Sequence, residues 1–517
     1  TRVLASPSKS LLALVLLVGA LLFAAVYARA QSDSEQADRS WLIDLLEEKL
    51  STPDRQFRIR NIQGVLSSDA TIGEISIADR EGVWLKITNA RIVWSRSSLL
   101  LGNLSIDSLS ADRIDITRKP VPAEGAPAPE SSGFQIPELP LSVDLRELNV
   151  PVIAFGPTVF GLQSEVSATG RLSLSGGALD TALNITRLDG PGGQLALTTT
   201  YANSSQELNL DFALSEPADG VVANLLNVEG KPPMALSLKG AGPLETLDLN
   251  LTLDADSQRV LTGTARLRRE ADGLGFTTNL EGPIARLIAP AYRAFFGQNT
   301  KLTATGVSHD AGGFELQSLD LTSAALALKA AMRTSADGFL DRLSLDASIS
   351  DANARKVVLP VAGGESTVDR ADLKLSFGET AGEQWSGNLD IAGLTSGDLS
   401  AQKIAIVLSG LAQDLNQPEQ RAITFNIDGD ITGLDSKKPE MAKALGKTIT
   451  LDANGDWRTG QPINVEMAEI KGNGLSLNLA GTIADYVYNG TLALAAQSIA
   501  PFSALAGRDL AGGLNLD

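Results

Sequence analysis

Apolar and polar residues alternate with a period of two through most of this chain. Four leucines at positions 247, 249, 251 and 253, for example, alternate with the polar residues Asp248, Asn250, Thr252 and Asp254. Successive side chains of a β-strand point to opposite faces of a sheet, so this spacing predicts strands with one apolar and one polar face. Runs of this kind, separated by Gly, Asn, Asp or Ser, fill residues 57–118 and 141–517. The pattern predicts a mainly β protein in which neighbouring strands pair in an irregular, elongated array.

A proline-rich segment separates these two regions. Residues 119–140 contain six prolines and two glycines. Proline lacks a backbone N–H and cannot continue a helix, so we expect a semi-rigid extended linker here. The predicted organisation is a short amphipathic helix and N-terminal β-subdomain in residues 31–118, a linker in 119–140 and a repetitive β-region in 141–517.

The N-terminal region has the pattern of a membrane segment. Residues 11–28 carry no charge, and Arg2 and Lys9 precede them. A helix of this length spans about 27 Å, close to the thickness of a bilayer core, and the basic flank places the N-terminus in the cytoplasm. Ala28-Arg29-Ala30 also fits a signal-peptidase site, so a cleaved signal is the alternative. We favour an uncleaved transmembrane signal anchor in residues 1–30, because the apolar run exceeds the usual signal length.

A few short helices interrupt the strand pattern. Ser40 to Leu50 has apolar residues at helical spacing, which predicts one amphipathic helix after the anchor. Brief helical interludes are predicted near Val221–Val228, Ile284–Phe296, Pro439–Leu445 and Pro501–Ala506, each bounded by Gly or Pro. The chain starts at Thr1 and stops inside an alternating run, so we interpret it as a piece of a longer protein, truncated at its C-terminus.

The apolar face of so many strands needs a cover. Burying each leucine contributes about 1.5 to 3 kcal/mol, and the cover is either a second sheet in a closed sandwich or barrel, or a ligand in a curled sheet. Alternation alone favours the sandwich, whereas the aromatic content of only 5% favours a smooth aliphatic groove for acyl chains. The candidate groove-lining residues are Leu247, Leu249, Leu251, Leu253, Leu319, Leu321, Ile423, Phe425, Ile427, Leu475, Leu477 and Leu479.

Composition excludes several classes of function. The net charge of −18 and the absence of a basic block argue against a nucleic-acid partner. The sequence has no Cys, which excludes thiolate catalysis, Cys-based metal sites and disulfides. These features leave packing as the source of stability.

The sequence offers no convincing catalytic constellation. Its single histidine, His309, stands between Ser308 and Asp310, but the groups of a catalytic triad converge from separate elements, so an exposed turn is the better interpretation. No HExxH, GxSxG, Walker A or dinucleotide-binding motif is present. The Gly-Gly pairs at 176–177, 192–193, 312–313 and 363–364 fall between strand runs and predict hairpin turns. We therefore expect a protein without enzymatic activity, metal or cofactor.

An ordered set of motifs in residues 62–120 resembles the N-terminal region of the TamB family. This family comprises inner-membrane subunits of the translocation and assembly module of Gram-negative bacteria, within the AsmA-like group. The resemblance is carried by ISIADREGVWL, ARIVW and LSIDSLSADRIDITRKP, and in particular by Gly64, Asp79, Gly82, Trp84, Leu85, Trp94 and Gly102. Later runs such as LQSLDLTSAALAL are similar to the family's middle repeats more loosely.

The resemblance implies a single-pass inner-membrane anchor bearing a long curled β-sheet, a β-taco or superhelical groove, in the periplasm. It implies roles in outer-membrane biogenesis: phospholipid transport between the two membranes, and assembly of outer-membrane or autotransporter proteins with a TamA-like β-barrel partner. The C-terminal domain that meets the barrel in this family is absent from these residues. Catalytic residues are not part of the family pattern.

With the resemblance added, the groove is favoured over the sandwich, and the predicted function is a bridge-like conduit for phospholipid acyl chains. One alternative is a periplasmic scaffold or chaperone that binds outer-membrane protein strands by β-augmentation, without lipid transport. Another is an adhesin-like passenger with a cleaved signal. The sequence does not distinguish which lipid is carried or in which direction.

Overall fold

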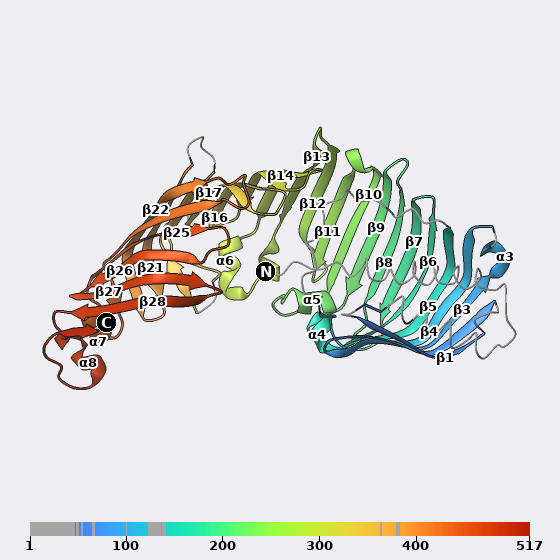
Figure 1. Ribbon diagram of the computed structural model, residues 1–517, viewed down its shortest axis with the longest axis horizontal. Helices are drawn as coiled ribbons and strands as arrows, with labels where there is room; N and C mark the ends of the chain where they lie inside the picture. Colours follow the sequence, from blue (N-terminus) through green and yellow to red (C-terminus); the bar gives the residue numbers. More distant parts are fainter. Residues whose placement is uncertain are drawn as a thin grey trace. The chain divides into compact units, whose positions relative to one another are not determined.

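The structure is a computed structural model that describes residues 47, 51–52, 55–64, 68–99, 101–121, 136, 141–361, 364–378 and 383–516. The chain divides into two compact units, unit 1 up to Arg259 and unit 2 from Val260 onward. In Figure 1 the strands of unit 1 run from blue to green and those of unit 2 from green to red. Each unit is built around an open, twisted sheet, so the predicted mainly β class is confirmed.

In unit 1 every strand pairs with the next one along the chain. All these pairings are antiparallel except one, because β4 and β5 run parallel. A parallel pair needs a connection that returns to the starting end of the first strand, and residues 117–141 form that connection. The strands are β1 (Gln56–Gln63), β2 (Asp69–Asp79), β3 (Gly82–Ser95), β4 (Asn103–Ile116), β5 (Ser142–Phe155), β6 (Ser164–Ser175), β7 (Ala178–Arg187), β8 (Gln194–Ala202), β9 (Glu207–Glu216), β10 (Met234–Pro243) and β11 (Asp248–Ala255).

Unit 2 is an antiparallel meander that starts with β12, whose first residues precede the unit boundary. Short strands β18, β19 and β24 attach at the side of the main pairings. The strands are β12 (Gln258–Arg269), β13 (Gly273–Gly282), β14 (Thr300–His309), β15 (Phe314–Thr322), β16 (Leu326–Thr334), β17 (Leu340–Ser350), β18 (Val357–Val358), β19 (Ser366–Val368), β20 (Arg370–Phe377), β21 (Gln384–Ser396), β22 (Leu399–Gln413), β23 (Ala422–Thr432), β24 (Asp435–Ser436), β25 (Thr448–Arg458), β26 (Ile463–Gly472), β27 (Leu475–Ala484), β28 (Val487–Ala496) and β29 (Leu514–Leu516).

The helices are short and lie in the connections between strands. All four predicted interludes are confirmed, as α5 (Val221–Leu225), η2 (Ile284–Leu287) with η3 (Pro290–Tyr292) and α6 (Arg293–Phe296), α7 (Pro439–Leu445), and η4 (Ala500–Phe502) with α8 (Ser503–Ala506). The sequence did not predict α3 (Arg96–Leu99), α4 (Pro157–Phe160) or η1 (Leu244–Thr246). Gly or Pro bounds most of these segments, which is why composition located the longer ones.

Several N-terminal strands are bent by β-bulges. Six apolar residues of β5 are spaced by two, three, two, three and two, at Val143, Leu145, Leu148, Val150, Ile153 and Phe155. Its ladder with β6 shifts register between Leu145 and Leu148 and again between Val150 and Ile153. A bulge inserts one extra residue and bends the strand, so a spacing of three across each bulge keeps all six side chains on one face.

Three hydrophobic clusters form the cores. In unit 1, one cluster around Trp94, Leu104 and Tyr201 lies where β4 starts, and a second around Phe57 and Leu85 lies on β1 to β4. In unit 2, Phe295 of α6 packs with Ala325, Val357 and Val368. The remaining apolar residues of the strands are mostly half-buried.

Parts of the predicted organisation fall outside the described residues. These are the predicted membrane segment 11–28, the possible cleavage site after Ala30, and most of the linker 119–140. Of the predicted helix Ser40–Leu50 only Glu47 is described, and it is helical. Within the described part of the chain, no helix combines the length and apolar character required to cross a membrane.

Candidate functional site

The most extensive candidate site is the apolar face of each sheet, and in unit 1 it is continuous from strand to strand. Backbone register aligns one row of apolar residues across β7 to β11: Leu183, Leu197, Phe212, Leu238 and Leu251. A parallel row contains Ile185, Leu195, Leu214, Leu236 and Leu253. Charged residues such as the Asp211–Lys239 ion pair, 2.8 Å between Oδ2 and Nζ, occupy the opposite face.

Unit 2 has the same arrangement over a longer series of strands. One register row runs through Leu302, Leu321, Leu328, Ala347, Leu373, Leu389 and Ile406. It continues through Gly429, Leu451, Ile470, Leu477 and Leu494 as far as β28. Alternation in the sequence therefore translates into an apolar surface that no strand interrupts with a charge at these row positions.

The twelve sequence-predicted residues lie on or next to these faces. Leu249, Leu251 and Leu253 are on β11, Leu319 and Leu321 on β15, Ile423, Phe425 and Ile427 on β23, and Leu475, Leu477 and Leu479 on β27. These eleven are half-buried, whereas Leu247 precedes β11 and is fully buried, so it is a packed residue and not part of an accessible wall. Whether any of them contacts a ligand stays a prediction.

The degree of burial argues against a sandwich. The inner faces of a β-sandwich are buried by a second sheet about 10 Å away. From β7 to β11 the row residues are half-buried, and in unit 2 Ile470 and Leu492 are 38% and 50% exposed. A second layer formed by described residues therefore does not cover these strands, and neither sheet closes into a barrel, because the first and last described strands of each unit do not pair.

Contact between two aromatic rings shows how strongly the sheet of unit 2 curves at one end of its strands. Phe339 precedes β17, and Trp457 lies on β25 opposite Ile423. Five pairings separate these strands (β17–β20, β20–β21, β21–β22, β22–β23 and β23–β25), which is about 24 Å in a flat sheet. The ring centroids are nevertheless only 5.9 Å apart and nearly parallel. The ends of these strands must therefore converge on the side of the apolar residues.

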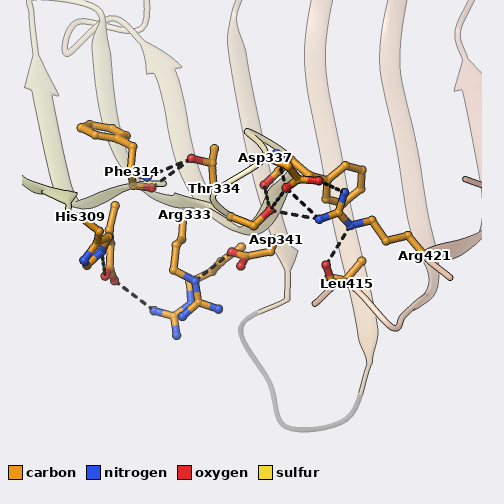
Figure 2. Close-up of polar contacts among 12 residues, drawn as sticks. His309, Phe314, Arg333, Thr334, Asp337, Asp341, Leu415 and Arg421 are labelled. Carbon is orange, nitrogen blue, oxygen red and sulfur yellow. Dashed lines mark hydrogen bonds and ion pairs between the residues drawn. The ribbon is translucent and has the colours of Figure 1, made fainter. Parts of the chain in front are cut away.

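A buried arginine holds these strand ends together. Arg421 is 5% exposed; its guanidinium donates hydrogen bonds to both carboxylate oxygens of Asp337, at 2.5 and 2.9 Å, and to the Ser335 hydroxyl. Its Nε donates to the carbonyl of Leu415, and its guanidinium carbon lies 4.1 Å from the centre of the Phe339 ring. Figure 2 shows this clasp with the strand ends that it joins. The hydrogen bonds from Arg421 and Ser335 hold the pKa of Asp337 well below its usual range.

Glycines on the apolar face make room for large neighbours. A Cβ at Gly410 would stand 1.9 Å from the carbonyl oxygen of Thr424 and 2.4 Å from the indole nitrogen of Trp385. Trp385 crosses this glycine and donates a 2.9 Å hydrogen bond to the same carbonyl. At Gly455 a Cβ would meet the Phe425 ring at 2.6 Å. Glycine within a strand marks such close approaches, and these positions allow large side chains to lie flat along the face.

The residues that carry the TamB resemblance have structural roles. Gly64, Gly82 and Gly102 have φ of 68°, 101° and 77°, values that favour glycine at strand ends. Leu85 and Trp94 are buried, and Trp84 packs against the cluster that contains Leu85. The seventh residue, Asp79, forms an ion pair with Arg118.

Asp79 is a buried carboxylate at the end of β2, with a side chain that is 4% exposed. It pairs with Arg118 through two hydrogen bonds of 2.7 and 2.5 Å and accepts the backbone N–H groups of Glu81 and Val121. Arg118 is the main cause of the strongly lowered pKa of Asp79. This arrangement ties the β2–β3 turn to the chain that follows β4.

The predicted exposed turn at His309 was wrong, because His309 is the last residue of β14 and its side chain is only 24% exposed. The His309 side chain, labelled in Figure 2, contacts other residues than its sequence neighbours Ser308 and Asp310. Its Nδ1 lies 3.2 Å from Asp272 and its Nε2 lies 3.8 Å from Glu315. Within the described ranges, no group of three or more acidic or histidine side chains is placed to hold a metal ion. The Gly-Gly pairs at 176–177, 192–193 and 312–313 connect antiparallel neighbours and are confirmed as hairpin turns, whereas Gly363 is not among the described residues.

One shallow depression lies on the polar face instead of the apolar one. It has a volume of about 300 Å³ and is lined mainly by small residues of β8 to β11, among them Ala196, Ala213, Ser215 and Ser237. Gln194, Thr252 and Asp254 also line it. It is a consequence of small side chains on neighbouring strands.

The sequence matches no protein-family model, no curated protein and no solved structure. The resemblance to the TamB family therefore stays a prediction.

Proposed function

We propose that this protein holds and conducts the acyl chains of phospholipids along the apolar faces of its sheets. The observation that carries this proposal is the continuous, half-buried row of apolar residues, illustrated by Leu197, Phe212 and Leu238 in unit 1 and by Leu328, Leu373 and Leu389 in unit 2. Large exposed apolar surfaces mark sites for lipids or partner proteins. An unbranched acyl chain matches a surface that offers no hydrogen-bond partner over many strands.

The shape that we propose for this surface is a curled groove, the β-taco or superhelical groove of the sequence analysis. Two observations support this shape. The bulges of β5 bend that strand, and the contact between Phe339 and Trp457 requires the ends of the strands between them to converge. A concave apolar face would shield the hydrocarbon of a lipid on several sides. The headgroup would remain in water at the edge, where the polar residues of the turns lie.

The mechanism that follows is passive. Acyl chains would exchange between neighbouring positions along a row because every position is apolar. The net direction would then depend on the membranes at either end. The described residues contribute binding and orientation, with no covalent step.

The cellular setting rests on the resemblance alone. We propose a single-pass inner-membrane anchor, with the bulk of the chain in the periplasm, and a role in outer-membrane biogenesis. The partner in protein translocation and assembly would be a TamA-like β-barrel. Localisation of the full-length protein by membrane fractionation would test this part separately.

The function can be tested with two neighbouring positions of β21. Leu389 is on the apolar face, and Asn388 is exposed on the opposite face. The parent chain, Leu389→Asp and the control Asn388→Asp would be purified without detergent, and the extracted lipid would be quantified by mass spectrometry. We expect bound phospholipid in the parent and in the control, and a marked loss in Leu389→Asp. Absence of lipid from a folded parent would contradict the proposal and favour a strand-binding scaffold.

A further inference from the structure

The rows of the apolar face of unit 1 differ in how exposed they are, according to their position along the strands. The row nearest the start of β4 comprises Leu104, Val143, Leu174, Leu179 and Tyr201 on successive strands. Four of these, all except Leu179, are at most 2% exposed. In the rows farther from the start of β4, Leu197, Phe212 and Leu238 are half-buried. Something covers the first row that does not cover the others.

Two residues of the connection between β4 and β5 contribute to this cover. Ile136 is 6% exposed and Leu141 is 8% exposed, and both belong to the cluster that contains Leu104, Val143 and Tyr201. The parallel pairing of β4 and β5 explains why the chain is present here, because the connection has to return to the end at which β4 starts. The β8–β9 turn lies at this same end of the sheet, since the strands from β5 to β8 alternate in direction.

A single side chain fixes the position of Ile136. The Ile136 backbone N–H donates to Oδ1 of Asn203 at 3.0 Å, and Nδ2 of Asn203 donates to the Ile136 carbonyl at 2.7 Å. Asn203 is in the β8–β9 turn, where its own backbone N–H is bonded to the Gly177 carbonyl. The Asn203 amide thus forms both hydrogen bonds of the Ile136 backbone that a neighbouring strand would form. These bonds place the Ile136 side chain against the apolar row.

We infer that Ile136, positioned by Asn203, is an end stop that occupies the first apolar row of unit 1 and restricts acyl chains to the rows beyond it. The branched aliphatic side chain has the same chemistry as a segment of an acyl chain, so the two exclude each other from one site. This inference rests on the proposed function, because it specifies which part of the apolar face takes the lipid. The accessible wall of unit 1 is then the surface of β7 to β11 that includes Phe212 and Leu238.

The test maps lipid contact at two positions of the whole chain. A photoreactive benzophenone amino acid would replace either Leu179, in the first row, or Phe212, two rows farther along. Each protein would be irradiated with vesicles of phosphatidylethanolamine and phosphatidylglycerol that contain a radiolabelled phosphatidylethanolamine. Ile136→Ser removes the stop and Asn203→Ala removes its anchor. Leu188→Ser is the matched control, because Leu188 is an exposed apolar residue in the β7–β8 turn.

In the parent we expect about tenfold more lipid label at position 212 than at 179, the ratio that corresponds to excluding one aliphatic contact. Ile136→Ser and Asn203→Ala should raise label at 179 severalfold and leave 212 unchanged, and Leu188→Ser should change neither. Equal labelling at both positions in the parent would overturn the end stop. The end stop would also be overturned if position 179 stayed unlabelled in Ile136→Ser while this variant kept the melting temperature of the parent, which would show that it is folded. Absence of label at both positions in every protein would instead overturn the proposed function, and the end stop with it.

Discussion

Replacing Arg421 by methionine tests whether the clasp in unit 2 stabilises the curvature of its sheet. Methionine keeps the apolar stem but loses the guanidinium, and with it the bonds to Asp337, Ser335 and the Leu415 carbonyl. The side chain of Asp337 is 41% exposed, so solvent screening reduces the value of this pair to about 1 kcal/mol. The two neutral acceptors and the contact with the Phe339 ring add about 1 to 2 kcal/mol. The expected loss in free energy of unfolding is therefore about 2 to 3 kcal/mol.

The assay is urea unfolding followed by tryptophan fluorescence and calorimetry. A loss of this size should lower the melting temperature of a unit of this length by about 5 to 10 °C. The control is Arg458→Met, because Arg458 is 73% exposed and its nearest carboxylate, on Asp456, is 3.8 Å away. We expect that control to cost less than about 0.5 kcal/mol. A result for Arg421→Met within about 0.5 kcal/mol of the control would refute the reasoning.

The same pair has a defined pH dependence. The folded state lowers the pKa of Asp337, so its ionised form contributes stability above the unfolded pKa of about 3.9, and this contribution disappears as the pH falls through the lower folded value. The deficit of Asp337→Asn relative to the parent should be constant from about pH 5 to 8 and should shrink below about pH 4. A deficit that grows on acidification would contradict this sign.

Three further substitutions follow from the same structure. Asp79→Asn should cost about 2 to 3 kcal/mol in thermal unfolding, because it weakens a buried, bidentate pair with Arg118; an unchanged melting temperature would contradict this. Gly410→Ala should lower the free energy of unfolding by about 1 to 3 kcal/mol, because its Cβ would lie 1.9 Å from a carbonyl oxygen. The control Gly429→Ala should cost much less, because the nearest atom to its Cβ is 3.2 Å away. Equal melting temperatures for the two variants would contradict the steric argument. Asp452→Asn should stabilise by about 0.2 to 1 kcal/mol, because carboxylates stand directly opposite on both flanking strands. That gain should diminish as salt is added.

The strand content was predictable because its signal is local. Alternation such as that of Leu249 and Asn250 identifies a strand and the face of each side chain, whichever strand becomes its neighbour. The helical interludes were predictable for a related reason, since Pro and Gly delimit Pro439–Leu445. The spacing of two and three in β5 also stands in the sequence, as a signature of bulges that a search for strict alternation overlooks.

The long-range features could not be predicted from local patterns. Arg421 and Asp337 are 84 residues apart, and nothing near either residue indicates its partner. The parallel pairing of β4 and β5 likewise depends on where the proline-rich connection returns, which alternation does not determine. For the same reason Ile136 had no signal as a buried residue. The face that carries the candidate site was thus predictable, whereas its cover at one edge was not.

Contact between lipid and the apolar face is the central claim, and a scan of β9 tests it most directly. The sequence has no cysteine, so each single cysteine introduced from Leu208 to Leu214 would carry the only fluorescent label. Phospholipid with a nitroxide on its acyl chain would then be added, and quenching would be measured at each position. The account predicts strong quenching at 210, 212 and 214, the half-buried apolar positions beyond the first row. It predicts weak quenching at 209, 211 and 213, which are exposed, and at 208, which continues the first row from Tyr201. Equal quenching at all seven positions, or none at any, would contradict it.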